Sequence, residues 1–441
     1  MEQRRKNLTQ LFIPICLETL LYMLSGMVDT LMLSSVNDQA VGAVGTANTY
    51  IGIFIIMFSV ISSGMVAVMT QNIGAGRPGV AYQARQLGLA FNAVLGVIMS
   101  LFLSLGAGTI LSGVGVADAL MQPAKTYLQI VGGFCILNAL IPICSSYLRA
   151  FGFSKEPLYA SIIGNVINFC LNAFFLFVLH KGVAGVATAT VISRIINLVI
   201  VVLLGAVLVK AKQHPERESN REVMGQIIRI GLPSACETAI YNVSMTLVIR
   251  FLNQMDAQGL NVTARSYTMQ ITNFSYCVGA ALAQANAIMT GWHIGAKEYD
   301  ACDRGTRKAA IIGVIVAVIL ETVFTLCSGW IMQLFSKDPQ MVSLVGKLLA
   351  IDIVLEIGRV TNLVYGQALK TSGDAVFPVV MGACFMILCS VGGTYLFGIR
   401  LGLLAVGAYI GMTGDECVRA VGMYLRWKSG KWKEKGLVKS R

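Results

Sequence analysis

The stretch PICLETLLYMLSGMVDTLML, residues 14–33, decides the fold because it is long and apolar enough to span a membrane yet contains two acids. A helix needs about 20 mostly apolar residues to cross a bilayer. The acids are Glu18 and Asp29. Together with Tyr22 and Ser25 they follow the spacing i, i+4, i+7 and i+11 in the order Glu18, Tyr22, Ser25 and Asp29. This spacing predicts that all four side chains share one face of a helix. Acids at membrane depth usually face a bundle interior or a water-filled path.

A second copy of this stretch follows one half-chain later, as PSACETAIYNVSMTLV at residues 233–248. The copy lies at an offset of 219 residues and replaces Asp29 with Val248. Other landmarks recur at an offset of 221, including the Ile-Gly-Ala runs at 73–75 and 294–296. The chain is therefore predicted to be a duplicated bundle in which only one half has the second acid. The matched pairs are Pro14 and Pro233, Glu18 and Glu237, Tyr22 and Tyr241, and Ser25 and Ser244.

Composition indicates an integral membrane protein. Of the 441 residues, 56% are hydrophobic and only 13% are charged, and the mean hydropathy is +0.71. A soluble domain has about 25% charged residues. The first apolar run is too long for a cleavable signal peptide and no small-residue cleavage site follows it. We predict an all-α membrane protein with twelve transmembrane helices in two six-helix lobes. The predicted spans are 10–34, 43–69, 86–112, 124–148, 157–179, 184–209, 227–253, 262–290, 305–332, 342–369, 375–397 and 403–426.

The predicted domains follow from these spans. Residues 1–209 are expected to form the N-terminal lobe and residues 227–426 the C-terminal lobe. The polar interval 210–226 is expected to be a cytoplasmic linker, and 427–441 a basic cytoplasmic tail. Because each half has an even number of spans, both copies enter the membrane from the same side. Such parallel repeats tend to place substrate sites near midplane at the repeat interface.

The net charge of +12 does not indicate nucleic-acid binding, because its distribution follows the predicted loops. With both termini on one side, the loops and adjoining span ends of that side contain 24 Lys and Arg residues, against 7 on the other. The positive-inside rule then places both termini in the cytoplasm. The expected location is the cell (inner) membrane. The tail is expected to anchor to lipid headgroups, with Trp427 and Trp432 at the interface. The expected partners are a small-molecule substrate and membrane lipids, with no nucleic acid, and the protein is expected to be a monomer.

Four stretches, spread over essentially the whole chain, resemble the multidrug and toxic compound extrusion (MATE) transporters. They are MVDTLMLS at 27–34, QNIGAG at 71–76, AQANAIMTGWHIGAK at 283–297 and ALKTSGDAVFP at 368–378. The resemblance implies a V-shaped pair of six-helix lobes that exports amphipathic, often cationic, compounds. It implies a secondary active transporter driven by inward flow of sodium ions or protons, not an enzyme, with no cofactor other than the coupling ion.

The resemblance also implies a cation-coupling site in the first lobe. Asp29 looks like the coupling carboxylate of the family, Asn168 and Asn172 sit where the fifth helix contributes, and Thr190 is a sixth-helix neighbour. Some relatives have Asp where Asn172 stands, so this site has one formal charge instead of two. The choice between sodium and proton therefore stays open. The row of amides on the fifth helix favours sodium, which prefers several hard oxygen ligands.

A second set of residues is predicted to line a substrate cavity. Asp352, Glu356 and Arg359 are spaced i, i+4 and i+7, which fits either an internally neutralised cluster or contacts to substrate or proton. The duplication of Glu18 as Glu237 favours a structural role for Glu18 and leaves both roles open for Glu237. The predicted cavity residues are Tyr22, Ser25, Glu237, Tyr241, Asp352, Glu356 and Arg359.

Two other functions stay open at this point. A lipid-linked oligosaccharide flippase of the same superfamily would be expected to have more cavity bases than Arg194, Arg359 and Arg419, the arginines well inside the spans and away from their ends. A membrane enzyme should show a His/Asp or Ser/His set, and a channel a filter-like loop, neither of which the sequence contains. Eleven cysteines without a CxxC pair, and three scattered histidines, predict neither a disulfide framework nor a metal site.

Overall fold

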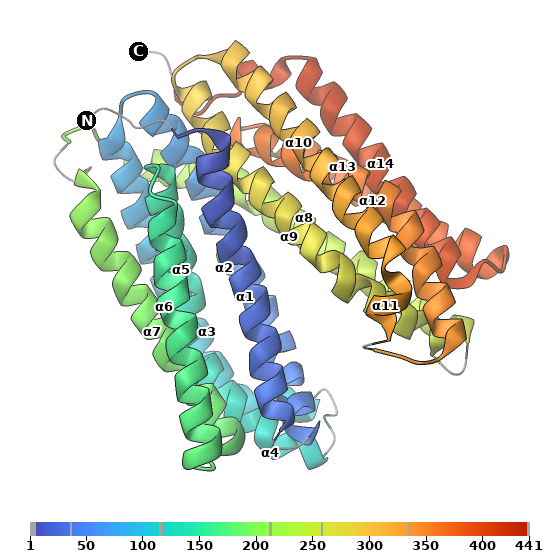
Figure 1. The fold of residues 1–441 in the computed structure, drawn as a ribbon. Helices are drawn as coiled ribbons and strands as arrows, with labels where there is room; N and C mark the ends of the chain where they lie inside the picture. The colour runs from blue at the N-terminus through green and yellow to red at the C-terminus, as the bar shows by residue number, and fades with distance from the viewer. Residues whose placement is uncertain are drawn as a thin grey trace. The chain divides into compact units, whose positions relative to one another are not determined.

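The computed structural model describes residues 6–35, 38–113, 116, 118–210, 214–256, 259–333 and 335–438, and every regular element among them is helical (Figure 1). Seven helices are long and apolar enough to cross a membrane, and the pair Leu120–Gly132 and Ile136–Ala150, bent by 43°, is an eighth. Four more helices are 25 to 36 residues long but more polar, which completes the twelve predicted spans. These four are α8 (Asn220–Met255), α9 (Leu260–Gly295), α12 (Pro339–Thr371) and α14 (Leu404–Lys428).

The chain divides into two compact units, Met1–Leu232 and Pro233–Arg441. The boundary falls inside α8, so this helix begins in the first unit and continues in the second. The predicted linker 210–226 contains the start of α8, and the residues just before it are fixed to the first unit. Arg77 forms an ion pair with Glu218 at 2.6 Å, and Arg217 donates to the Gly79 carbonyl oxygen at 2.6 Å.

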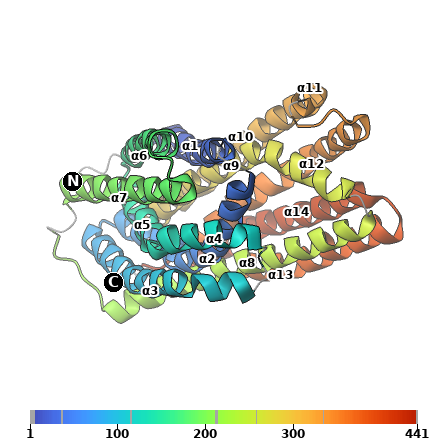
Figure 2. The same ribbon diagram turned by 90° about the horizontal axis from the view of Figure 1, so that it is seen from below.

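The first unit is built from six spans, and α6 packs against both α1 and α7 (Figures 1 and 2). Two short π-helical turns, η1 and η2, interrupt the fourth and fifth spans. The elements are α1 (Leu8–Ser34), α2 (Asp38–Gly74), α3 (Pro78–Gly113), α4 (Asp118–Tyr127), η1 (Leu128–Gly132), α5 (Ile136–Ala150), α6 (Lys155–Ala173), η2 (Phe174–Val178) and α7 (Gly182–Leu208).

The second unit repeats this order, with α12 packed against α9, α10 and α14. Helices α9, α10, α13 and α14 begin 221 or 222 residues after α2, α3, α6 and α7, which is the register of the sequence repeat. The glycines at the matched turns, Gly152 and Gly373, both have positive φ, at 87° and 99°. The remaining elements are α10 (Tyr299–Leu326), α11 (Ser328–Met332), α13 (Val376–Phe385), η4 (Met386–Val391), η5 (Thr394–Arg400) and η6 (Lys431–Glu434).

The start of α8 crosses α2 through two glycines. A Cβ atom on Gly64 would lie 1.9 Å from the Ile227 carbonyl oxygen, and one on Gly231 would lie 1.7 Å from the Val60 carbonyl oxygen. Side chains at these positions would separate the backbones. Small residues permit such close approach between membrane helices.

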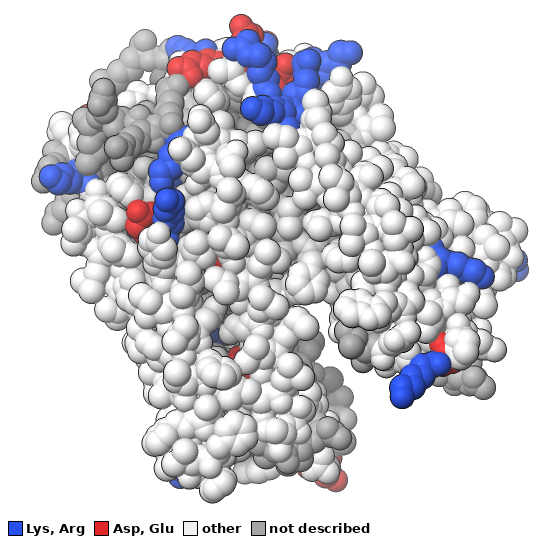
Figure 3. Space-filling view, in the orientation of Figure 1, with Lys and Arg blue, Asp and Glu red and all other residues white. Residues whose placement is uncertain are grey.

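Charge is concentrated toward the helix ends on the face that Figure 3 shows, and most of the exposed helix flank is uncharged. Large apolar side chains are open to the surroundings along these flanks, among them Leu105, Val207 and Ile319, which are 84%, 72% and 57% exposed. Hydrocarbon is the environment that accepts such a surface. The protein is therefore a multi-pass membrane protein.

The two tryptophans that were expected to contact lipid headgroups are buried inside the second unit. Trp427 and Trp432 are 2% and 1% exposed and stack on each other, with ring centroids 4.2 Å apart. The Trp427 indole donates to Asp303 and the Trp432 indole to the Trp427 carbonyl oxygen, both at 2.9 Å. Buried Tyr and Trp usually find hydrogen-bond partners inside the protein. The start of the tail is therefore held in the second unit through these side chains.

Candidate cation site and buried charge network

The Asp29 carboxylate meets the row of amides on α6 within the first unit. Asn172 Nδ2 donates to Asp29 Oδ1 at 2.7 Å and to Asn168 Oδ1 at 3.2 Å. Asn168 and Asn172 are 5% and 0% exposed. The Asn172 Oδ1 atom is buried and has no hydrogen-bond partner among the described residues. The structure thus brings three predicted residues together and leaves one amide oxygen unused.

The helix that presents these amides changes its winding directly after them. The α-helix α6 ends at Ala173, and the π-helical turn η2 begins at Phe174. A π turn widens the helix locally and is frequent at functional sites. The amides at Asn168 and Asn172 therefore lie in the last regular turns before this irregularity.

Two side chains that sequence reasoning did not assign to the site act on Asp29. Arg194 on α7 attracts the Asp29 carboxylate electrostatically, and Tyr127 on α4 lies close enough to interact with both. The Arg194 charge opposes a second cation at the same carboxylate, because like charges repel more strongly where the dielectric constant is low. No local motif signals either residue, since helices distant in sequence bring them to Asp29.

The other predicted residues of the first unit differ in exposure. Thr190 is 6% exposed, and its hydroxyl donates to the Val186 carbonyl oxygen of its own helix at 2.9 Å. Ser25 is half-buried, and Tyr22 is 67% exposed. Along the polar face of α1, exposure therefore falls from the exposed Tyr22 to the half-buried Ser25 and Asp29.

The described residues of the second unit contain no counterpart of the cation site. Val248, which matches Asp29, is fully buried in an apolar cluster with Leu252 and Ile271. At an offset of 221, Cys389 and Gly393 stand where Asn168 and Asn172 stand in the first half. The duplicated scaffold thus holds the carboxylate and its amides once.

The duplicated glutamates each have a basic partner. Glu18 Oε2 lies 2.5 Å from Arg149 Nη2, which connects α1 to α5. Glu237 Oε2 lies 2.6 Å from Lys370 Nζ, which connects α8 to α12. The bases are themselves 221 residues apart, so the ion pair is duplicated as a whole. This explains why both halves have the acid.

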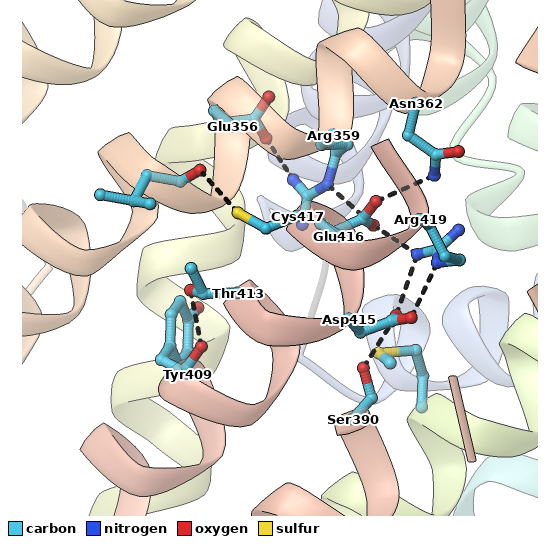
Figure 4. Close-up of polar contacts among 12 residues, drawn as sticks. Glu356, Arg359, Asn362, Ser390, Tyr409, Thr413, Asp415, Glu416, Cys417 and Arg419 are labelled. Atoms are coloured by element: carbon cyan, nitrogen blue, oxygen red, sulfur yellow. Dashed lines mark hydrogen bonds and ion pairs between the residues drawn. The ribbon is translucent and has the colours of Figure 1, made fainter. Parts of the chain in front are cut away.

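A second charge network lies inside the second unit, on α12 and α14 (Figure 4). Arg359 forms an ion pair with Glu356 and approaches Glu416 Oε1 at 3.7 Å. Arg419 contacts Asp415 Oδ1 at 2.7 Å and Glu416 Oε1 at 2.9 Å. The two arginines therefore share Glu416. Neutral groups complete the network: Asn362 donates to Glu416 Oε2 and Ser390 to Asp415 Oδ2, both at 3.0 Å.

Comparison with known proteins identifies the scaffold. A family model, MatE, matches the chain twice, at residues 14–174 and 233–396, and so covers most of it. The chain belongs to the MatE family. The two matches begin at Pro14 and Pro233, which are the matched prolines of the repeat. MatE proteins are membrane transporters, and the recognition from sequence is confirmed.

Relatives match this MatE protein from end to end. It is 34% identical over 431 residues to the uncharacterized transporter YisQ of Bacillus subtilis (strain 168), covering 96% of this chain and 94% of that protein. It is 24% identical to the probable multidrug resistance protein NorM of Thermotoga maritima, covering 98% and 94%. Among solved structures, an outward-facing MATE family transporter superposes with a TM-score of 0.87 at 18% identity over 98% of this chain and 96% of that one. A MATE structure in the bent conformation gives 0.88 at 19% identity, covering 97% and 96%.

Within this MatE protein, the cluster predicted at Asp352, Glu356 and Arg359 is only partly neutralised. Arg359 pairs with Glu356 and Glu416, whereas Asp352 lies with Glu321 and Glu356. Of the other predicted cavity residues, Tyr241 interacts electrostatically with Arg359, and Glu237 pairs with Lys370. Sequence spacing found the members that share α12. It could not find Glu416 or Glu321, because these acids come from other helices.

Proposed function

We propose that this MatE protein is a secondary active transporter that exports amphipathic, cationic small molecules in exchange for sodium ions or protons. The observation that carries the proposal is the Asp29 carboxylate, held by Asn172 in the first unit and absent from the matched position Val248. Packing of the duplicated scaffold alone does not require an acid there. The names of several relatives, probable multidrug resistance proteins, support the substrate class.

The exchange needs one group that holds the coupling ion and releases it on the other side. Asp29 can do so for either ion. A proton needs only its carboxylate, and sodium also needs neutral oxygens, which Asn168, Asn172 and Thr190 would supply. The unpartnered Asn172 Oδ1 favours sodium, whereas the nearby charge of Arg194 weakens the attraction of Asp29 for either ion. Sodium thus remains the prediction of the amide row, with the proton as its alternative.

The flippase alternative is less well supported. A pyrophosphate-linked substrate would need free bases, because phosphate is recognised mainly by Arg and Lys. Arg359 and Arg419 both have acid partners. In our proposal the protein acts as a monomer in the cell membrane, with both termini in the cytoplasm and no organic cofactor.

Efflux from proteoliposomes tests the proposal. Vesicles containing the purified protein are loaded with a fluorescent lipophilic cation, and either a sodium gradient or a pH gradient is imposed while the other is clamped. We expect one of the two gradients to accelerate efflux over protein-free vesicles. Equal rates with and without either gradient would overturn the proposal.

A further inference from the structure

Three acids from two helices converge inside the second unit. Glu321 on α10 and Asp352 and Glu356 on α12 are 0%, 2% and 0% exposed. One carboxylate oxygen from each lies within 4.8 Å of the others. In the sequence, Glu321 is an isolated acid in an apolar span, and nothing in its spacing connects it with α12. The fold therefore creates a cluster of carboxylates that the sequence does not show.

Most oxygens of this cluster have no hydrogen-bond partner among the described residues. The unpartnered atoms are both Glu321 oxygens, Asp352 Oδ2 and Glu356 Oε2. Ser275 on α9 is 1% exposed, its Oγ atom makes no hydrogen bond of ordinary geometry, and it lies close enough to Glu321 to interact with it. A buried polar atom without a partner destabilises the folded state. Several such oxygens in one place indicate a ligand that interacts with them.

The charge balance indicates which ligand fits. The cluster and the ion pairs of Figure 4 together contain five acids and two arginines, which is an excess of three negative charges among the described residues when every carboxyl group is ionised. A buried charge without compensation strongly destabilises the folded state. One monovalent ion would leave two excess charges, and one divalent ion would leave one. The acids are Glu321, Asp352, Glu356, Asp415 and Glu416, and the bases are Arg359 and Arg419.

We infer that Glu321, Asp352, Glu356 and Ser275 form a binding site for one hard divalent cation such as Ca²⁺ or Mn²⁺. Carboxylate oxygens are the ligands that such cations prefer. Ca²⁺ takes six to eight oxygen ligands at about 2.3–2.6 Å, so two ligands of one ion lie at most roughly 5 Å apart. The carboxylate oxygens of the cluster lie within 4.8 Å of one another, which is close enough to share one ion. Arg359 holds Glu356 through Oε1 and leaves Oε2 for the ion.

Equilibrium binding of Mn²⁺ tests the site. Purified full-length protein in detergent is stripped with a chelator and titrated with Mn²⁺, and free Mn²⁺ is followed by electron paramagnetic resonance. We expect one Mn²⁺ per chain, displaced by Ca²⁺ and not by an equal concentration of Na⁺. Glu321→Gln and Asp352→Asn should weaken binding at least about 100-fold, and Ser275→Ala about tenfold. Asp338→Asn, which neutralises an exposed acid at the start of α12, is the matched control and should bind like the wild type.

Three results would overturn the inference: no saturable binding in the wild type, unchanged binding in Glu321→Gln, or loss of binding in Asp338→Asn. If the carboxylate variants fail to fold, thermal unfolding of the wild type decides. An ion that binds only the folded state raises the unfolding midpoint with concentration. Ser275→Ala should move that dependence to higher ion concentrations. A midpoint indifferent to Ca²⁺ and Mn²⁺ would contradict the site and leave protons as the groups that neutralise the acids.

Discussion

At the scale of residues, the cation site is a single carboxylate whose neighbours have opposite effects on a bound ion. Asn172 already donates to Asp29, and its free oxygen is the kind of ligand that sodium uses. Arg194 adds a positive charge from α7, which weakens the attraction for any cation. The identity of the coupling ion therefore depends on Asn172 more than on any other neutral residue of the site.

Replacing Asn172 with leucine tests this dependence. If sodium is the coupling ion, Asn172→Leu should abolish the acceleration of efflux by external sodium at fixed pH, because it removes an oxygen ligand beside Asp29. The matched control is Asn165→Leu, which removes another amide of α6, three residues before Asn168. This variant should keep the acceleration by sodium. Efflux in the wild type that follows the pH gradient and ignores sodium would assign the exchange to protons instead.

Residues of the site differ in how far the sequence could predict them. Asp29 was predictable as an acid in an apolar span, and Asn168 and Asn172 as a polar row on one helix, but it was the resemblance to the MATE transporters that assigned the three to one site. Arg194 and Tyr127 were not predictable, because their positions relative to Asp29 depend on the packing of α4 and α7. Helical spacing reports neighbours on one helix only.

At the scale of elements, the crossing of α2 and the start of α8 depends on Gly64 and Gly231. Their missing Cβ atoms allow backbone contact that any other residue would prevent. Glu18 with Arg149, and Glu237 with Lys370, fasten α1 to α5 and α8 to α12 in the same way in each half. Sequence reasoning favoured a structural role for Glu18 from its duplication alone. It did not identify the basic partners.

Gly231→Ala should lower the thermal stability of the purified protein, because its Cβ would lie 1.7 Å from the Val60 carbonyl oxygen. Overpacking of this kind costs about 1–3 kcal/mol. Gly225→Ala on the same helix meets no atom within 4 Å and should be neutral or stabilising by up to about 1 kcal/mol. Unfolding midpoints in detergent compare the two variants, and equal midpoints would show that the crossing tolerates a side chain.

At the scale of the whole molecule, the two halves share one arrangement of helices but differ in the polar side chains that they bury. Asp352, Glu356 and Arg359 correspond at an offset of 221 to Val131, Cys135 and Asn138 in the first half. The repeat, the all-helical fold and the twelve spans were predictable, because hydropathy and a constant register report them directly. The separate charge networks were not, because each joins helices that are far apart in sequence.

The distribution of basic residues predicts that both termini are cytoplasmic. A reporter active only in the cytoplasm, fused after Arg441, should be active, because the loops on the side of the termini contain most of the Lys and Arg residues. The same reporter inserted after His180, between η2 and α7, should be inactive. Activity in the reverse pattern would refute this topology.

Gradient-driven efflux by Asp29→Asn tests the account most directly. The substitution removes the charge of the one carboxylate that Asn172 holds and leaves a side chain of the same shape. The matched control is Asp338→Asn, at the exposed start of α12, where Asn also caps a helix well. The account predicts that Asp29→Asn folds and inserts but shows no efflux in response to either gradient, while Asp338→Asn transports normally. Efflux by Asp29→Asn at the wild-type rate would contradict the account.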